Sequence, residues 1–143
     1  ANYASNFSLR LSFFIAILNV CLLFLAGELL IGLYTNDQSV VIKALGLLVL
    51  AAIFQIPDAI GFSAIGSLRG HIDTFVTMVN LVISYWFFAL PIGVYLAFNE
   101  IGGLPNEAEG IWVGMIIGIT LSAILNTGRL KFKKGLLKKL SQF

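Results

Sequence analysis

Four long apolar runs, separated by short polar segments, limit what this chain can fold into. A helical run of about 20 residues matches the hydrocarbon core of a bilayer, and a helix satisfies its own backbone hydrogen bonds there. Charged residues make up 11% of the chain, against about 25% in soluble domains, and the mean hydropathy is +0.96. The sequence therefore predicts an all-α fold, a polytopic transmembrane helical bundle.

The expected membrane helices form one unit, residues 1–130, followed by a basic tail, residues 131–143. In the tail, lysines alternate with Leu and Phe, which is typical of a segment on the anionic cytoplasmic leaflet. Its partner should be the lipid bilayer, and we expect no nucleic-acid partner. The four helices should cover about residues 9–33, 40–67, 74–98 and 110–130.

The distribution of basic residues predicts the orientation. Four crossings place Arg10, Arg69 and the basic tail on one side of the membrane and leave Lys43 on the other side, with the acidic loop 99–109. Loops rich in Lys and Arg stay in the cytoplasm. Both ends of this chain should therefore be cytoplasmic.

An acid beside a proline, near the middle of the second run, is the strongest functional signal. A carboxylate at the centre of a spanning helix costs about 2.5–3.5 kcal/mol, so Asp58 should face a bundle interior or a wet cavity. Pro57 cannot donate to the carbonyl of Ile53, which predicts a kink and an unpaired acceptor. Transporters hold Na⁺ or a proton with such groups. We predict a cation site formed by Asp58, the Ile53 carbonyl and Gln55.

A structural role for Asp58 is the alternative, in which a polar group of another helix satisfies the carboxylate. Catalysis is not expected, because the sequence offers no pair of acids, no His/Cys cluster and no Ser/His/Asp set within reach of one another. The expected ligands are coupling ions, Na⁺ or H⁺, with no cofactor and no metal other than Na⁺ at Asp58. A second kink is predicted at Pro91, where no ionisable residue lies nearby.

Two further patterns concern contacts between helices. Gly110, Gly114 and Gly118 lie four residues apart, a ladder of small residues that permits close approach of a neighbouring helix. Asn80 and Ser84 lie one helical turn apart, as expected for hydrogen bonds between helices or for the wall of a cavity.

Several motifs in a fixed order resemble the multidrug and toxic compound extrusion (MATE) family, most closely its NorM-type bacterial members. The order and spacing of these motifs are far more specific than any one of them. They are, in order, Gln55-Ile56-Pro57-Asp58, Gly66-Ser67-Leu68-Arg69-Gly70-His71-Ile72-Asp73, Tyr85-Trp86 and Leu90-Pro91-Ile92-Gly93. Downstream, Gly110-Ile111-Trp112-Val113-Gly114 and Arg129-Leu130 are similar to the last helix of that family.

This resemblance implies a twelve-helix inner-membrane transporter of a bacterial cell, with two pseudo-symmetric lobes of six helices. Such proteins export cationic or lipophilic compounds in exchange for Na⁺ or H⁺, and the present chain is similar to their ninth to twelfth helices. The missing N-terminal helices would be its partners. Asp58 matches the family's cation-site aspartate, whereas Phe54 stands where relatives commonly have tyrosine. Phe54 can offer a cation only the face of its ring.

The substrate cavity of such a transporter should be apolar and aromatic. Four aromatic residues are available to line it, namely Phe62, Tyr85, Phe87 and Phe88. Two other functions remain open from the residues: a small four-helix transporter that dimerises, and a membrane scaffold that transports nothing.

Overall fold

Helices make up nearly all of the part of the chain that the computed structural model describes, residues 2–99 and 107–140. Four helical stretches in these residues are long and apolar enough to cross a membrane, and there is no strand among them. The predicted all-α fold with four membrane helices is confirmed. The helices are α1 (Asn2–Tyr34), α2 (Gln38–Gly70), α3 (Thr74–Val82), η1 (Ile83–Ala89), α4 (Leu90–Phe98) and α5 (Glu107–Leu140).

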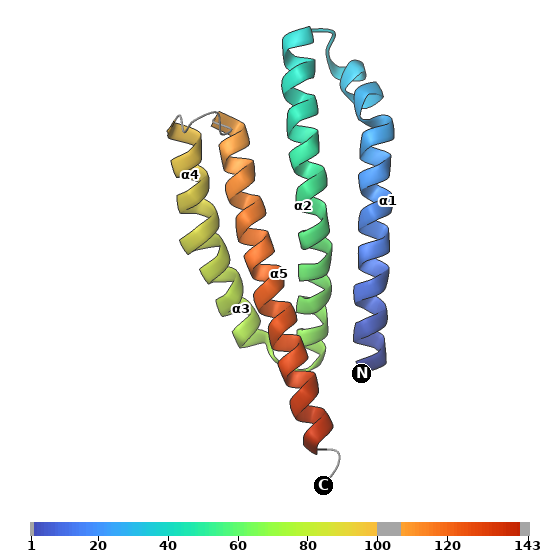
Figure 1. Ribbon diagram of the computed structural model, residues 1–143, viewed down its shortest axis with the longest axis vertical. Helices are drawn as coiled ribbons and strands as arrows, with labels where there is room; N and C mark the ends of the chain where they lie inside the picture. The colour runs from blue at the N-terminus through green and yellow to red at the C-terminus, as the bar shows by residue number, and fades with distance from the viewer. Residues whose placement is uncertain (1, 100–106, 141–143) are drawn as a thin grey trace.

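The helices pack as an up-and-down arrangement in which the last helix, α5, inserts between α2 and the helix formed by α3, η1 and α4 (Figure 1). The helix α2 lies between α1 and α5, and α5 also packs along α4 and η1. The chain enters α1 and leaves α5 at the same end of the bundle, where the short turn between α2 and α3 also lies (Figure 1). This end is called the turn end below.

The helix α5 continues through residue 130, where the last membrane helix was expected to end, as far as Leu140. Leu130 itself is only 1% exposed, because it packs with Ala64 and Leu68 of α2. The basic segment is therefore an extension of α5 that protrudes beyond the other helices (Figure 1). Its contact with the cytoplasmic leaflet stays a prediction.

The two prolines inside the membrane helices have different surroundings. Pro57 lies within α2, which is assigned as one helix on both sides of it. Pro91 is the second residue after η1, a stretch of π-helix at whose end the N–H of Leu90 donates to the carbonyl of Tyr85, five residues earlier. Such widened turns are uncommon and are frequent at functional sites. The sequence predicted a disturbance at Pro91 but not its π-helical form.

The glycine ladder of α5 packs against the helix formed by α3, η1 and α4, as predicted. A Cβ atom at Gly110 would overlap the backbone of Ala97, and one at Gly114 would overlap Gly93. At Gly118 the nearest atom is the Cβ of Ala89. Small residues on both helices let the two backbones approach closely, which is how membrane helices gain packing energy.

Most large apolar side chains lie on the outside of the bundle. On α1, for example, Leu25 is 82% exposed and Leu33 is 74% exposed. In water such a surface would favour aggregation. In a bilayer it contacts lipid or other helices at no such cost, as expected for a multi-pass membrane protein.

Candidate functional site: polar groups of the α2 midpoint and the turn end

Two polar side chains lie three residues apart near the middle of α2. Asp58 is partly buried and makes no hydrogen bond or ion pair with the described residues. Gln55, one helical turn before it, has a buried side-chain oxygen that also lacks a hydrogen-bond partner among them. Residues three apart share a helix face. The described chain therefore presents a carboxylate and an amide oxygen together, deep in a membrane helix.

Two neighbouring residues of the predicted cation site face α5. Phe54 packs edge-on against Trp112, with ring centroids 5.9 Å apart and an interplanar angle of 85°. This is a favourable aromatic geometry. The side chain of Ile53 lines a groove between α2 and α5 together with Pro57. Phe54 therefore helps to hold α2 on α5, while Gln55 and Asp58 keep their polar oxygens unsatisfied.

The predicted aromatic residues are only partly brought together. Phe62 and Tyr85 line one small cavity of about 60 Å³, together with Arg69 and Ser122. Phe87 and Phe88 do not line this cavity and are 70% and 42% exposed. Drug-sized ligands need about 300–1,000 Å³, so this cavity of the isolated chain does not hold one.

Tyr85 also lies near the predicted site. It belongs to η1, and its phenol is within electrostatic range of the Asp58 carboxylate of α2. The sequence reading placed Tyr85 only in the substrate cavity and gave no sign of this proximity. A π-helical turn opposite the membrane acid was not predictable from a single sequence, because it depends on how η1 packs on α5.

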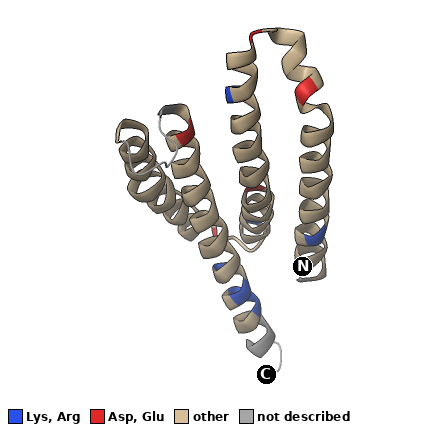
Figure 2. Ribbon diagram, turned by 45° about the horizontal axis from the view of Figure 1, so that its top comes forward, with Lys and Arg blue, Asp and Glu red and all other residues tan. Residues whose placement is uncertain are grey.

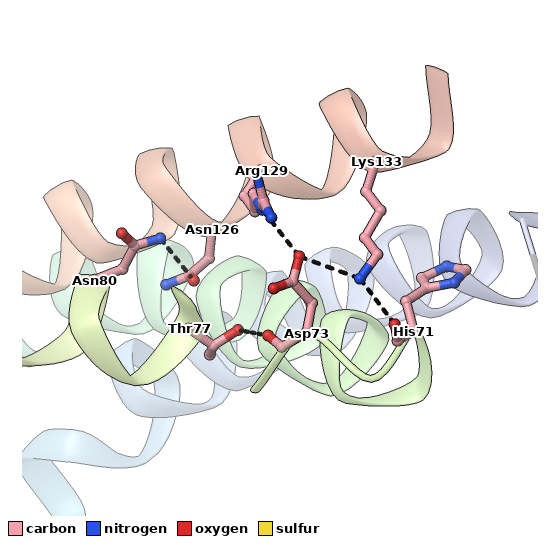
Figure 3. A network of polar contacts seen from close by, with 7 residues as sticks. All are labelled: His71, Asp73, Thr77, Asn80, Asn126, Arg129 and Lys133. Carbon is pink, nitrogen blue, oxygen red and sulfur yellow. Dashed lines mark hydrogen bonds and ion pairs between the residues drawn. The ribbon is translucent and has the colours of Figure 1, made fainter. Parts of the chain in front are cut away.

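Apart from Asp58, the described charges lie toward the helix ends, and a cluster of them joins α5 to the turn between α2 and α3 (Figures 2 and 3). The Arg129 Nε donates to the Asp73 Oδ2 at 2.9 Å, and the Lys133 Nζ lies 3.3 Å from the same oxygen. Lys133 also donates to the carbonyl of His71 at 2.8 Å. The hydrogen bond from Arg129 lowers the pKa of the Asp73 carboxyl below its usual value.

Two asparagines, Asn80 of α3 and Asn126 of α5, face each other in the same view (Figure 3). The Asn80 side-chain nitrogen donates to Asn126 Oδ1 at 3.2 Å, so the predicted hydrogen bonding between helices is confirmed for Asn80. Asn126 is fully buried and donates to the Ser122 carbonyl at 2.9 Å. Ser84 is buried without a hydrogen-bond partner among the described residues.

The sequence reading missed Asn126 and the ion pairs of Asp73, although a signal was present. Ser122, Asn126, Arg129 and Lys133 are spaced by four, three and four residues, which puts them on one face of a helix. Ending the last helix at residue 130 divided this polar stripe and hid its continuity.

Comparison with known proteins gives several relatives over most of the chain. Over 125 residues, 87% of the chain and 26% of the relative, it is 33% identical to the multidrug resistance protein PmpM of Pseudomonas aeruginosa. It is 38% identical to the multidrug resistance protein NorM of Vibrio parahaemolyticus over 108 residues, 76% of the chain and 24% of the relative. It is 40% identical to a probable NorM protein of Xylella fastidiosa over 108 residues, 76% of the chain and 22% of that protein.

The chain thus spans about a quarter of the length of these curated relatives. No protein-family model matches it. The relatives are named for multidrug resistance, in agreement with the expectation that the chain is not an enzyme.

Proposed function

Because the chain belongs to the NorM-type MATE family of multidrug efflux transporters, we propose that it supplies the last four helices of such a transporter and binds its coupling ion at Asp58. The complete transporter would export cationic or lipophilic compounds by antiport with Na⁺ or H⁺. We place it in the bacterial inner membrane with both ends of this chain in the cytoplasm.

One observation supports the site more than any other. The Asp58 carboxylate and the Gln55 amide oxygen lie one turn apart in the middle of α2, and neither is hydrogen-bonded within the described residues. The Gln55 oxygen is buried, and buried polar oxygens are normally satisfied. Hard cations take oxygen ligands, so a bound ion would satisfy both oxygens at once. The phenol of Tyr85, on a different helix, is within electrostatic range of Asp58 and would offer a further oxygen near the ion.

Antiport follows from the chemistry of one carboxylate. A proton and Na⁺ compete for the same oxygens, so release of the ion and binding of substrate can be coupled through the helix that carries Asp58. Pro57 leaves this helix with one backbone hydrogen bond fewer beside the acid. A change at Asp58 is therefore transmitted to a weakened point of α2.

The length of the relatives supports a part of a large transporter over a small four-helix transporter that dimerises. The chain covers 22% to 26% of three of them. A scaffold without transport would give no reason for a carboxylate without a partner at the centre of a membrane helix, which costs about 2.5–3.5 kcal/mol.

Efflux from membrane vesicles carrying the full-length protein tests this proposal. Ethidium export is measured for the wild type and for Asp58→Asn, first with an imposed Na⁺ gradient and then with an imposed pH gradient. We expect the substitution to abolish export in the gradient that drives the wild type, because the amide has lost the charge that binds the ion. The effective gradient identifies the coupling ion.

Asp37→Asn is the matched control. Asp37 is an acid in the turn before α2, where its side chain accepts from the N–H of Ser39, and asparagine caps helices equally well. Export by this variant should match the wild type. Undiminished gradient-driven export by a folded Asp58→Asn protein would show that the acid is structural.

A further inference from the structure

An apolar groove with a volume of about 680 Å³ lies on the surface of the described bundle, between α2 and α5. It lies beside Pro57, whereas Asp58 is not part of its lining. Nearly all of its walls are hydrocarbon, and one charged side chain, Lys131, lines it. The lining consists of Ile53, Ile56, Pro57, Ile60, Ile116, Thr120, Ala123, Ile124, Thr127, Gly128 and Lys131.

Lys131 differs from the other basic residues of α5 whose side chains the structure describes. Arg129 and Lys133 bind the α2–α3 turn, and Lys134 donates to the side-chain oxygen of Asn6 at 2.8 Å. Lys131 has no hydrogen bond or ion pair with any described residue, and it is exposed. The cation at the groove is therefore free to bind an anion from outside the protein.

The groove runs along α5 toward the turn end. Its lining on α5 runs from Ile116 to Lys131, a rise of about 22 Å along the helix. On α2 its lining runs from Ile53, near the middle of the helix, to Ile60. One leaflet contributes about 15 Å of hydrocarbon. A groove that starts near the middle of a membrane helix and rises by about 22 Å is therefore long enough to bring Lys131 to the headgroup level.

The charge of the groove favours a lipid over a helix as the occupant. A slender hydrocarbon chain suits the apolar walls. A helix would have to bring an acid to Lys131, whereas an anionic lipid carries its phosphate to that depth by itself.

We propose that this groove binds one anionic phospholipid of the cytoplasmic leaflet, with an acyl chain between α2 and α5 and the headgroup phosphate at Lys131. Basic residues between membrane helices on the cytoplasmic side are suited to such headgroups. The bound lipid would contact Pro57 on one face of α2 while Asp58 lies outside the groove. The bound lipid would therefore lie against α2, the helix that carries the proposed ion site.

Native mass spectrometry of the full-length transporter tests the proposal. The protein is titrated with phosphatidylglycerol or with phosphatidylcholine of the same acyl chains. We expect the wild type to retain one phosphatidylglycerol in preference to phosphatidylcholine. In Lys131→Gln the affinity for phosphatidylglycerol should fall about fivefold, which corresponds to about 1 kcal/mol for one lysine near an anionic surface. Its affinity for phosphatidylcholine should not change.

Two further variants distinguish the groove from general attraction to a basic helix. Lys134→Gln removes the same charge, but from a lysine that is bound to Asn6, and should change the affinity less than twofold. Ile124→Trp fills the groove at a residue that is 63% exposed, and should weaken retention of both lipids.

Equal phosphatidylglycerol binding by the wild type and Lys131→Gln would overturn the proposal. So would unchanged lipid binding in Ile124→Trp. If that variant instead lowers the unfolding temperature and leaves lipid binding intact, a helix of the remaining transporter fills the groove and the proposal is wrong.

Discussion

Ile72, in the turn between α2 and α3, holds a backbone conformation that few residues tolerate. Its φ is 58°, in the left-handed region, which costs about 1–2 kcal/mol for a residue with a Cβ atom. Its side chain is 91% exposed, so truncation removes little packing. The neighbouring contacts of the turn keep the strained residue in place, since the N–H groups of Ile72 and Asp73 donate to carbonyls at the end of α2.

Ile72→Gly should therefore stabilise the protein. We expect the free energy of unfolding to rise by about 0.5–1 kcal/mol, because the relief of strain exceeds the extra entropy of glycine in the unfolded chain. Thermal unfolding of the full-length protein in detergent measures the change. Ile72→Val keeps the strain and serves as the control. A glycine variant no more stable than the valine variant would contradict this reading.

The ion pairs of Asp73 should make stability depend on pH. The hydrogen bond from Arg129 lowers the pKa of Asp73 in the folded state below its value in the unfolded chain. Its contribution is therefore fully present above the unfolded pKa, about 3.9, and is lost as the pH falls through the lower folded value. We expect Asp73→Asn to cost about 1–2 kcal/mol at pH 7, and this difference from the wild type to shrink below about pH 4.

Unfolding temperatures of both proteins between pH 3 and pH 8 measure that difference. Arg129→Gln provides the partner for a double-mutant cycle. If Asp73→Asn lowers the stability by breaking this ion pair, then Arg129→Gln should lower the stability of the Asp73→Asn protein much less than it lowers the stability of the wild type. Additive losses, or a difference that does not depend on pH, would rule out the pair as the cause.

At the scale of the element, the packing of α5 requires glycines on one face, whereas another face has room for larger side chains. A Cβ at Gly114 would overlap the backbone of Gly93, whereas a Cβ at Gly128 meets no atom within 4 Å. Both residues lie inside the same helix, so alanine improves helix propensity equally at each. The two positions therefore isolate the effect of packing.

Gly114→Ala should destabilise the protein by about 1–3 kcal/mol, because two closely packed backbones must separate. Gly128→Ala should be neutral or should stabilise by up to about 1 kcal/mol. Unfolding temperatures of the two full-length variants, measured side by side, test this. Equal effects at the two positions would mean that α5 does not pack on α4 in the way the structure describes.

At the scale of the whole molecule, the turn end and the opposite end should face different compartments. We expect Ala4, near the start of α1, to be cytoplasmic and Asn36, between α1 and α2, to face outward. In a protein with Cys21→Ala, a cysteine at position 36 should react with a membrane-impermeant maleimide in intact cells. A cysteine at position 4 should react only after the membrane is opened. Labelling of position 4 from outside would reverse the orientation.

Much of the fold was predictable from the sequence because it depends on local pattern. The apolar runs predicted four membrane helices, and the third, 74–98, coincides with the continuous stretch Thr74–Phe98. The glycine spacing of α5 predicted close packing, since a residue without a side chain on every fourth position has one main use in a membrane helix. The acid beside Pro57 predicted the place of the ion site, which stays a prediction.

The sequence by itself thus determined which segments cross the membrane and which residues are exceptional there, because burying a charge or a backbone group in lipid has a large cost wherever it occurs. The tertiary structure alone decided which exceptional groups meet. Asp73 pairs with Arg129, 56 residues away, and Tyr85 of η1 lies within electrostatic range of Asp58 of α2. The π-helical form of η1 and the groove at Lys131 were likewise visible only in the tertiary structure. Each follows from how α5 lies against its neighbours, and helix packing is set by side-chain surfaces that no single segment contains.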